Sequence, residues 1–141
     1  MADRKANAEW QGGLKDGKGK VALGSGLFEG AYSFATRMEN EPGTNPEELL
    51  GASLASCYAM ALNAILEGGG TPAKSVSVEA NVHLGKDDGG FVIKGIDLDA
   101  KADVDGLDEA AFKEIAEKVK TTCPISKALT GTKITLNASL A

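Results

Sequence analysis

Apolar residues occupy every side of the segment from Leu49 to Leu66, which predicts a long helix buried in a core. Asn45 precedes a proline and is the expected N-cap, with Pro46 in the first helical position. Glu48 falls where its carboxylate can reach back to the backbone N–H of the cap. Gly68-Gly69-Gly70 is expected to end the helix, and Cys57 lies in its middle.

Alternating apolar and polar residues predict strands on both sides of this helix. Residues 8–38 are expected to form three short strands separated by glycine-bearing turns, the third with Tyr32, Phe34, Thr36 and Met38 on one face and Arg37 on the other. Residues 76–84 and 92–104 alternate about the turn Lys86-Asp87-Asp88-Gly89-Gly90, which predicts a hairpin. Residues 133–140 alternate in the same way and predict a closing strand.

A second helix is expected between the hairpin and the closing strand. Asp108 is its predicted N-cap, and Phe112, Ile115, Val119 and Cys123 follow one apolar face. Pro124 should break the helix, after which residues 125–129 can restart as a short one with Cys123 as N-cap. A thiolate in that position faces free backbone N–H groups, which would lower its pKa.

These elements predict a single α+β domain over residues 1–141, with antiparallel sheets around a long buried central helix. Its 141 residues are enough for one substantial core. One sheet covers only one side of a helix that is apolar all round, so we expect a second copy of the chain to cover the rest. The predicted assembly is a homodimer.

Composition narrows the classes of partner. The chain is 43% hydrophobic and 25% charged, and its net charge of −5 argues against nucleic acid or an anionic membrane surface. Ser53, Ser56 and Asn63 make the central segment too weakly apolar for a membrane span. No signal-peptide pattern follows Met1, so a cytoplasmic location is expected. With one histidine and two cysteines, no metal site or cofactor is expected.

Two interpretations of the cysteines remain open from the residues alone. Cys57 and Cys123 can be inert core residues, or they can be partners in a transient redox cycle. Cys123 has the better helix-end argument for reactivity. Glu47 lies about 80° around the helix from Cys57 and about 15 Å along it, so only a long cationic side chain could link the two.

Four motif blocks resemble the osmotically inducible protein C family. They are Thr36-Arg37-Met38, Gly43-Thr44-Asn45-Pro46-Glu47-Glu48-Leu49-Leu50-Gly51-Ala52, Ala55-Ser56-Cys57-Tyr58-Ala59-Met60-Ala61-Leu62 and Cys123-Pro124-Ile125-Ser126-Lys127-Ala128-Leu129. The arginine just before the loop to the central helix favours the osmotically inducible branch over the organic hydroperoxide resistance branch. The resemblance extends from about Trp10 to the C-terminus.

This resemblance implies an intertwined homodimer and a thiol peroxidase that acts on organic hydroperoxides, and on hydrogen peroxide less well. It assigns the attacking role to Cys57 and the resolving role to Cys123. Arg37 would hold the Cys57 thiolate, and Glu47 would orient Arg37. A dithiol or a lipoylated protein would be the reductant. The alternatives are a non-enzymatic thiol redox sensor and a stress protein that binds a hydrophobic ligand.

Overall fold

The computed structural model describes residues 1–141 and contains six strands and four helices, which confirms the predicted α+β class. Its internal contacts divide the chain into an N-terminal unit, Met1–Leu49, and a C-terminal unit, Leu50–Ala141. That residues 1–141 form a single domain stays a prediction.

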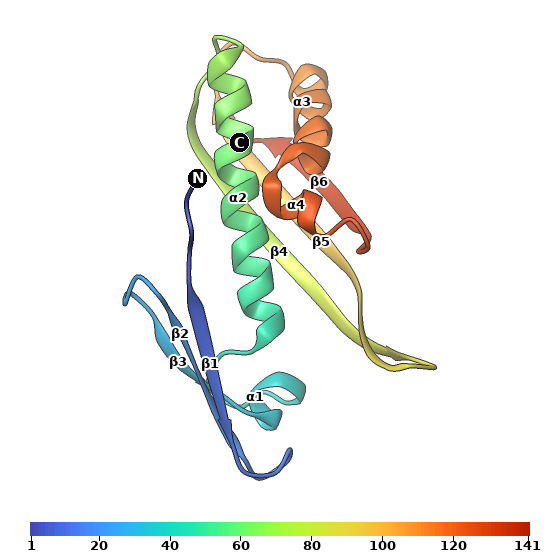
Figure 1. Ribbon diagram of the computed structural model, residues 1–141. Helices are drawn as coiled ribbons and strands as arrows, with labels where there is room; N and C mark the ends of the chain where they lie inside the picture. The colour runs from blue at the N-terminus through green and yellow to red at the C-terminus, as the bar shows by residue number, and fades with distance from the viewer. The chain divides into compact units, whose positions relative to one another are not determined.

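The N-terminal unit is built on a three-stranded antiparallel sheet (Figure 1, blue). The strands β1 (Ala6–Gln11), β2 (Lys18–Leu23) and β3 (Glu29–Tyr32) lie in that order. Gly19 pairs with both Trp10 and Tyr32, whose ring centroids lie 5.6 Å apart. A Cβ on Gly19 would come within 2.5 Å of the Tyr32 ring, so the glycine allows the two aromatic rings to meet across β2.

The prediction that the third strand continues to Met38 is wrong. β3 ends at Tyr32, and the short helix α1 (Phe34–Met38) follows, with Arg37 in its last turn. Ser33 caps this helix: its hydroxyl accepts the Thr36 N–H at 3.1 Å, and the Thr36 hydroxyl accepts the Ser33 N–H at 2.8 Å. This reciprocal cap satisfies two backbone donors locally, and it outweighs the alternation of large side chains that suggested a strand.

The long helix α2 (Pro46–Gly68) begins where predicted. The Asn45 side chain accepts the Glu48 N–H at 2.8 Å, as expected for an N-cap. The other half of the expected cap is wrong, because the Glu48 carboxylate accepts a 2.9 Å hydrogen bond from the Thr44 hydroxyl instead of the Asn45 N–H. A nearer hydroxyl donor therefore replaces the backbone donor.

The sheet of the C-terminal unit is mixed, which corrects the expectation of antiparallel sheets only. It has the order β4 (Ala73–Asp87), β5 (Gly90–Val104) and β6 (Ile134–Leu140). β4 and β5 form the predicted antiparallel hairpin, whereas β6 pairs with β5 in parallel. The reason is the connection: α3 (Glu109–Thr122) and α4 (Pro124–Ala128) carry the chain back before β6 begins.

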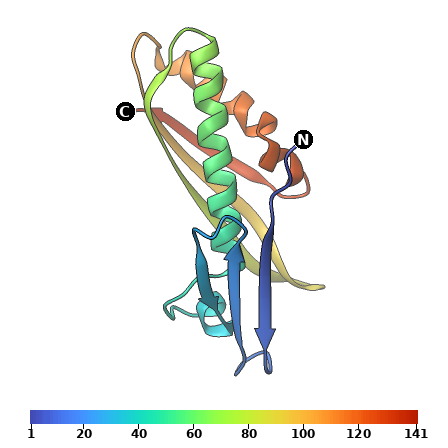
Figure 2. The ribbon, with the colours of Figure 1, turned by 60° about the vertical axis from the view of Figure 1, so that its left-hand side comes forward.

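The core of the C-terminal unit lies between this sheet and the two longer helices, which lie on the same face of the sheet (Figures 1 and 2). Four fully buried residues of α2 point into it: Leu54, Tyr58, Leu62 and Leu66. They meet one face of β5, together with α3 residues such as Phe112 and Val119. The core also takes in Cys123.

Within this chain, helix α2 is buried along one face, as expected for a helix covered by one sheet; that a second copy of the chain covers the remaining sides stays a prediction. Ala52, Ser56, Met60 and Ala64 are exposed, and Met60 retains 77% of its accessible surface. By length and composition alone, α2 is apolar enough to cross a membrane, so the prediction that this segment is too weakly apolar for a span is wrong. Its four fully buried residues nevertheless belong to the core of the C-terminal unit.

We predict that Tyr58→Phe lowers the free energy of unfolding by about 1 kcal/mol, the usual contribution of one neutral hydrogen bond. Tyr58 is fully buried, and its hydroxyl donates to the Ala116 carbonyl of α3 at 2.8 Å. Urea unfolding followed by circular dichroism measures the change. Tyr32→Phe is the matched control, because Tyr32 is only half-buried and its hydroxyl has no hydrogen bond. Equal stability of the two variants would contradict the prediction.

Candidate active site

Cys123 lies at the junction of two helices, as the sequence predicted. It is the C-cap of α3, where its N–H donates to the Val119 carbonyl at 3.2 Å, and the N-cap of α4, with Pro124 in the first position. Its sulfur accepts the Ser126 N–H at 3.4 Å. The side chain is fully buried. The proline ends one helix and starts the next, and this fixes the cysteine between them.

Cys57 lies in α2, half-buried, and its thiol interacts with that of Cys123. Both thiols are free. The C-terminal unit therefore brings together the two cysteines that the sequence singled out, although they are far apart along the chain. The backbone N–H of Ile125, in the first turn of α4, acts to lower the pKa of Cys57.

The two thiols have opposite pKa shifts. Burial raises the pKa of Cys57; the Ile125 N–H opposes this, and Cys123 adds to it. Burial also acts to raise the pKa of Cys123, but donors outweigh it: the Ser126 hydroxyl and N–H, the Cys57 thiol and the Ile125 N–H leave that pKa below its ordinary value. Within the C-terminal unit, a negative charge is therefore better stabilised on Cys123 than on Cys57.

Arg37 and Glu47 form a second pair, inside the N-terminal unit. The Arg37 Nε donates to Glu47 Oε2 at 3.0 Å, and Nη2 donates to Oε1 at 2.6 Å, which is a bidentate arrangement. The Glu47 side chain is 10% exposed and that of Arg37 is 38% exposed. The Glu47 hydrogen bond raises the pKa of Arg37 above its ordinary value, so the guanidinium is a permanent cation.

The sequence did not identify Ser126 as a site residue, although Ser126 belongs to the motif that begins at Cys123. It is only 5% exposed, and its hydroxyl lies 3.3 Å from the Cys123 sulfur. The signal in the sequence was its spacing: a residue three positions after an N-cap is the one whose backbone and side chain can both reach the cap. A serine there is an ordinary choice in a short helix, so the spacing alone did not distinguish it.

His83 and the acidic residues form no further site. His83 is exposed on the polar face of β4, and its Nε2 lies 2.6 Å from Asp97 Oδ2. No group of three or more histidine, cysteine, aspartate or glutamate side chains in residues 1–141 could hold a metal ion.

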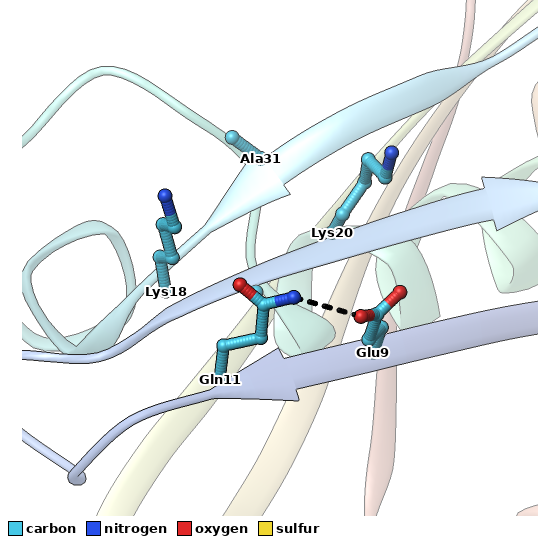
Figure 3. Close-up of a pocket in the computed structure, with 6 residues that line it drawn as sticks. Glu9, Gln11, Lys18, Lys20 and Ala31 are labelled. Carbon is cyan, nitrogen blue, oxygen red and sulfur yellow. Dashed lines mark hydrogen bonds between the residues drawn. The ribbon is translucent and has the colours of Figure 1, made fainter.

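A hollow of about 280 Å³ lies on the sheet of the N-terminal unit (Figure 3). Its charged and polar lining comes from β1 and β2: Glu9, Gln11, Lys18 and Lys20. Gln11 donates to Glu9 at 2.9 Å, as the dashed line in Figure 3 marks. Neither cysteine lines this hollow, so it does not enter the candidate active site.

Comparison with known proteins gives consistent results. Residues 38–137 match the sequence model of the family described as OsmC-like protein. Peroxiredoxin OsmC of Escherichia coli K12 is 43% identical over 138 residues, which cover 97% of this chain and 96% of that protein. The organic hydroperoxide resistance protein of Xanthomonas axonopodis pv. citri is 33% identical over 90 residues, covering 63% of this chain and 61% of its own.

Solved structures agree with the sequence matches. The organic hydroperoxide resistance protein OhrB of Bacillus subtilis superimposes with a TM-score of 0.72 at 27% identity, covering 97% of this chain and 98% of that one. An organic hydroperoxide resistance protein from Elizabethkingia anophelis gives a TM-score of 0.78 at 26% identity, over 97% and 96% of the two chains.

We predict that the pKa of Cys123 lies below that of an ordinary thiol when Cys123 is the only cysteine in the chain. In the Cys57→Ser variant, the introduced hydroxyl keeps a donor near the Cys123 sulfur, and the Ser126 donors remain. Since the pKa of Cys123 is lowered, its thiolate persists to lower pH than in an unfolded chain. The ultraviolet absorbance of the thiolate, followed against pH, gives the midpoint. The same variant in concentrated guanidinium chloride is the control, and a folded midpoint at or above the unfolded one contradicts the assignment.

Proposed function

Because this chain belongs to the OsmC-like protein family, in its osmotically inducible branch, we propose that it is a thiol-dependent peroxidase that reduces organic hydroperoxides. The branch follows from the 43% identity to peroxiredoxin OsmC over 97% of the chain, against 33% over 63% for an organic hydroperoxide resistance protein. The observation that carries the proposal is the meeting of two free thiols, Cys57 and Cys123, in one core. Hydrogen peroxide is the poorer substrate.

In the first step, the Cys57 thiolate attacks one oxygen of the hydroperoxide. A sulfur–oxygen bond forms as the oxygen–oxygen bond breaks, so Cys57 is oxidised to a sulfenic acid and the substrate is reduced. The departing alkoxide takes a proton and leaves as the alcohol. Cys57 is suited to this role because it is only half-buried, whereas Cys123 is fully buried.

Cys57 needs a cation to be ionised near neutral pH, because burial and the neighbouring thiol raise its pKa. We infer that the Arg37 guanidinium supplies this charge. It is a permanent cation, and the bidentate bond to Glu47 restricts its orientation. Glu47 and Cys57 stand on the same helix, α2. In this proposal Glu47 is a positioning residue that acts through Arg37.

Cys123 then resolves the sulfenic acid. Its thiolate attacks the Cys57 sulfur, a disulfide forms, and hydroxide leaves and is protonated to water. An external dithiol, either a small molecule or a lipoylated protein, reduces the disulfide and is itself oxidised. A dithiol reductant and two cysteines that must be reduced in each cycle fit the reducing cytoplasm.

We further propose that the protein is a homodimer joined along the exposed face of α2. Ala52, Ser56 and Ala64 are small enough for another backbone to approach closely, and Met60 is a large apolar side chain left in water. A second copy of the same helix fits this face, because small residues and a methionine on each side complement one another about a two-fold axis.

We predict steady-state consumption of cumene hydroperoxide in the presence of dihydrolipoamide, and its loss in Cys57→Ser. A redox sensor would consume one equivalent and stop, and a ligand-binding protein would consume none. Peroxide consumption followed by a colorimetric assay separates these outcomes. Sustained turnover by Cys57→Ser would overturn the assignment of the attacking thiol.

We predict that Arg37→Met lowers kcat/KM roughly 100-fold at neutral pH, the order expected when a preorganised charge is removed from a reacting anion. The deficit should shrink as the pH is raised, because alkaline solution ionises Cys57 without the guanidinium. The pH dependence of kcat/KM is the measurement. Arg4→Met is the matched control, since Arg4 is the other arginine and is exposed near the N-terminus. A loss that stays constant with pH would contradict the role of Arg37.

We predict that the unsubstituted protein sediments with twice the 14.5 kDa mass of one chain and that Met60→Glu shifts it toward the monomer. A carboxylate buried in an apolar interface has no partner and would be desolvated at a large cost. Lys101→Glu also introduces a carboxylate, at an exposed position of β5 and with a larger change of net charge, and serves as the control. Analytical ultracentrifugation measures the mass in solution of the unsubstituted protein and of the two variants. A Met60→Glu variant that remains dimeric would refute this interface.

A further inference from the structure

Ser126 is the one buried polar residue of the C-terminal unit, and its partner is a sulfur. The other two buried polar residues, Thr44 and Glu47, lie in the N-terminal unit. A buried hydroxyl is costly unless it is hydrogen-bonded. The contact of the Ser126 hydroxyl is the Cys123 sulfur at 3.3 Å, and the Ser126 N–H donates to the same sulfur at 3.4 Å.

We propose that Ser126 is a positioning residue for the resolving thiol, whose hydroxyl donates to the Cys123 sulfur whenever that sulfur carries a negative charge. This inference rests on the proposed peroxidase cycle, and it assigns a role to a residue outside the set Arg37, Glu47, Cys57 and Cys123.

The local fold explains why a serine at this position can do this. Pro124 sets the start of α4 and has no N–H of its own, so the next backbone donors belong to Ile125 and Ser126. The Ser126 N–H closes the cap on Cys123, which fixes the serine backbone and directs its hydroxyl to the same atom. Sulfur is a weak acceptor when neutral and a much stronger one as a thiolate, so the hydroxyl discriminates between the two states.

The charge appears on Cys123 at two points of the cycle. In resolution, the Cys123 thiolate gives its electron pair to the Cys57 sulfur, and hydroxide leaves. In reduction, a thiolate of the dithiol attacks the Cys57 sulfur, the sulfur–sulfur bond breaks, and the electron pair returns to Cys123. The second thiol of the reductant then displaces Cys57 and closes the reductant's own disulfide. Because a leaving thiol of lower pKa departs faster, the Ser126 hydroxyl should matter most in reduction.

The first test is the rate at which dihydrolipoamide reduces the preformed Cys57–Cys123 disulfide, measured by stopped flow. We expect Ser126→Ala to slow this step roughly tenfold, as for the loss of one charge-assisted hydrogen bond. Ser126→Thr keeps a hydroxyl and should restore most of the rate. Thr122→Val is the matched control, because the Thr122 hydroxyl stands beside Cys123 in sequence but bonds to the Val119 carbonyl. An unchanged rate in Ser126→Ala would overturn the proposal.

The second test separates a charge effect from packing. In the Cys57→Ser background, Ser126→Ala should move the thiolate titration midpoint of Cys123 upward, and Ser126→Thr should return it. A residue that merely fills space would leave the midpoint where it is, and that result would refute the role. If Ser126→Ala does not fold, Ser126→Val compared with Ser126→Thr gives two side chains of one shape that differ only in the hydroxyl.

The two experiments also distinguish failure of this inference from failure of the proposed function. The titration needs no substrate and no turnover, so it reports on Ser126 whatever the protein does. If the unsubstituted protein consumes no hydroperoxide while the midpoint still shifts, the peroxidase proposal fails and the Ser126–Cys123 interaction stands. If turnover is normal and neither the midpoint nor the reduction rate changes, the peroxidase stands and the role of Ser126 is refuted.

Discussion

Two neighbouring sulfurs receive unequal numbers of hydrogen-bond donors, and the chemistry proposed for this protein depends on that difference. The core of the C-terminal unit holds α2 against α3, with the buried bond from Tyr58 to the Ala116 carbonyl one residue from Cys57. Helix α4 begins directly after Cys123, and its first turn supplies Cys123 with more hydrogen-bond donors than it supplies to Cys57. The same packing that brings the sulfurs together therefore makes them chemically different.

This difference suits the two cysteines to different roles in the proposed cycle, Cys123 to resolution and Cys57 to attack on the hydroperoxide. A sulfur that is already well supplied with donors is a good leaving group and a stable anion, which suits the resolving position. A sulfur that lacks them is a stronger nucleophile once ionised, but it needs a charge from elsewhere. The Arg37–Glu47 pair is a charge of the right kind, because a bidentate bond holds the guanidinium and no accessible pH removes it. In the proposed cycle, the donors at the start of α4 lower the pKa of Cys123, and the Arg37 guanidinium would lower that of Cys57.

Local signals in the sequence predicted the helix ends and the short helix after Pro124, because each depends on residues a few positions apart. Asn45, Asp108 and Cys123 all cap the helices they were expected to cap. The wrong predictions concern the direction of β6 and the helix after Ser33, neither of which is determined by the alternation of apolar and polar residues. The pattern of β6 is the same for a parallel and an antiparallel strand, and the residues around Ser33 fit a strand until their reciprocal cap is counted. The meeting of Cys57 with Cys123 is a tertiary fact that no spacing reveals.

Helix α2 is nearly uniform in hydrophobicity along all its sides, but the sizes of its side chains are not uniform. Leu54, Tyr58, Leu62 and Leu66 form a stripe of large residues at intervals of four, and this stripe enters the core. The opposite stripe, with the same spacing, contains mainly alanine and serine and stays exposed. Cys57 falls about 100° from Tyr58, on the border between the two. Its half-burial follows from that position, which places the sulfur beside Cys123 and, in the proposed function, leaves part of it accessible to a hydroperoxide.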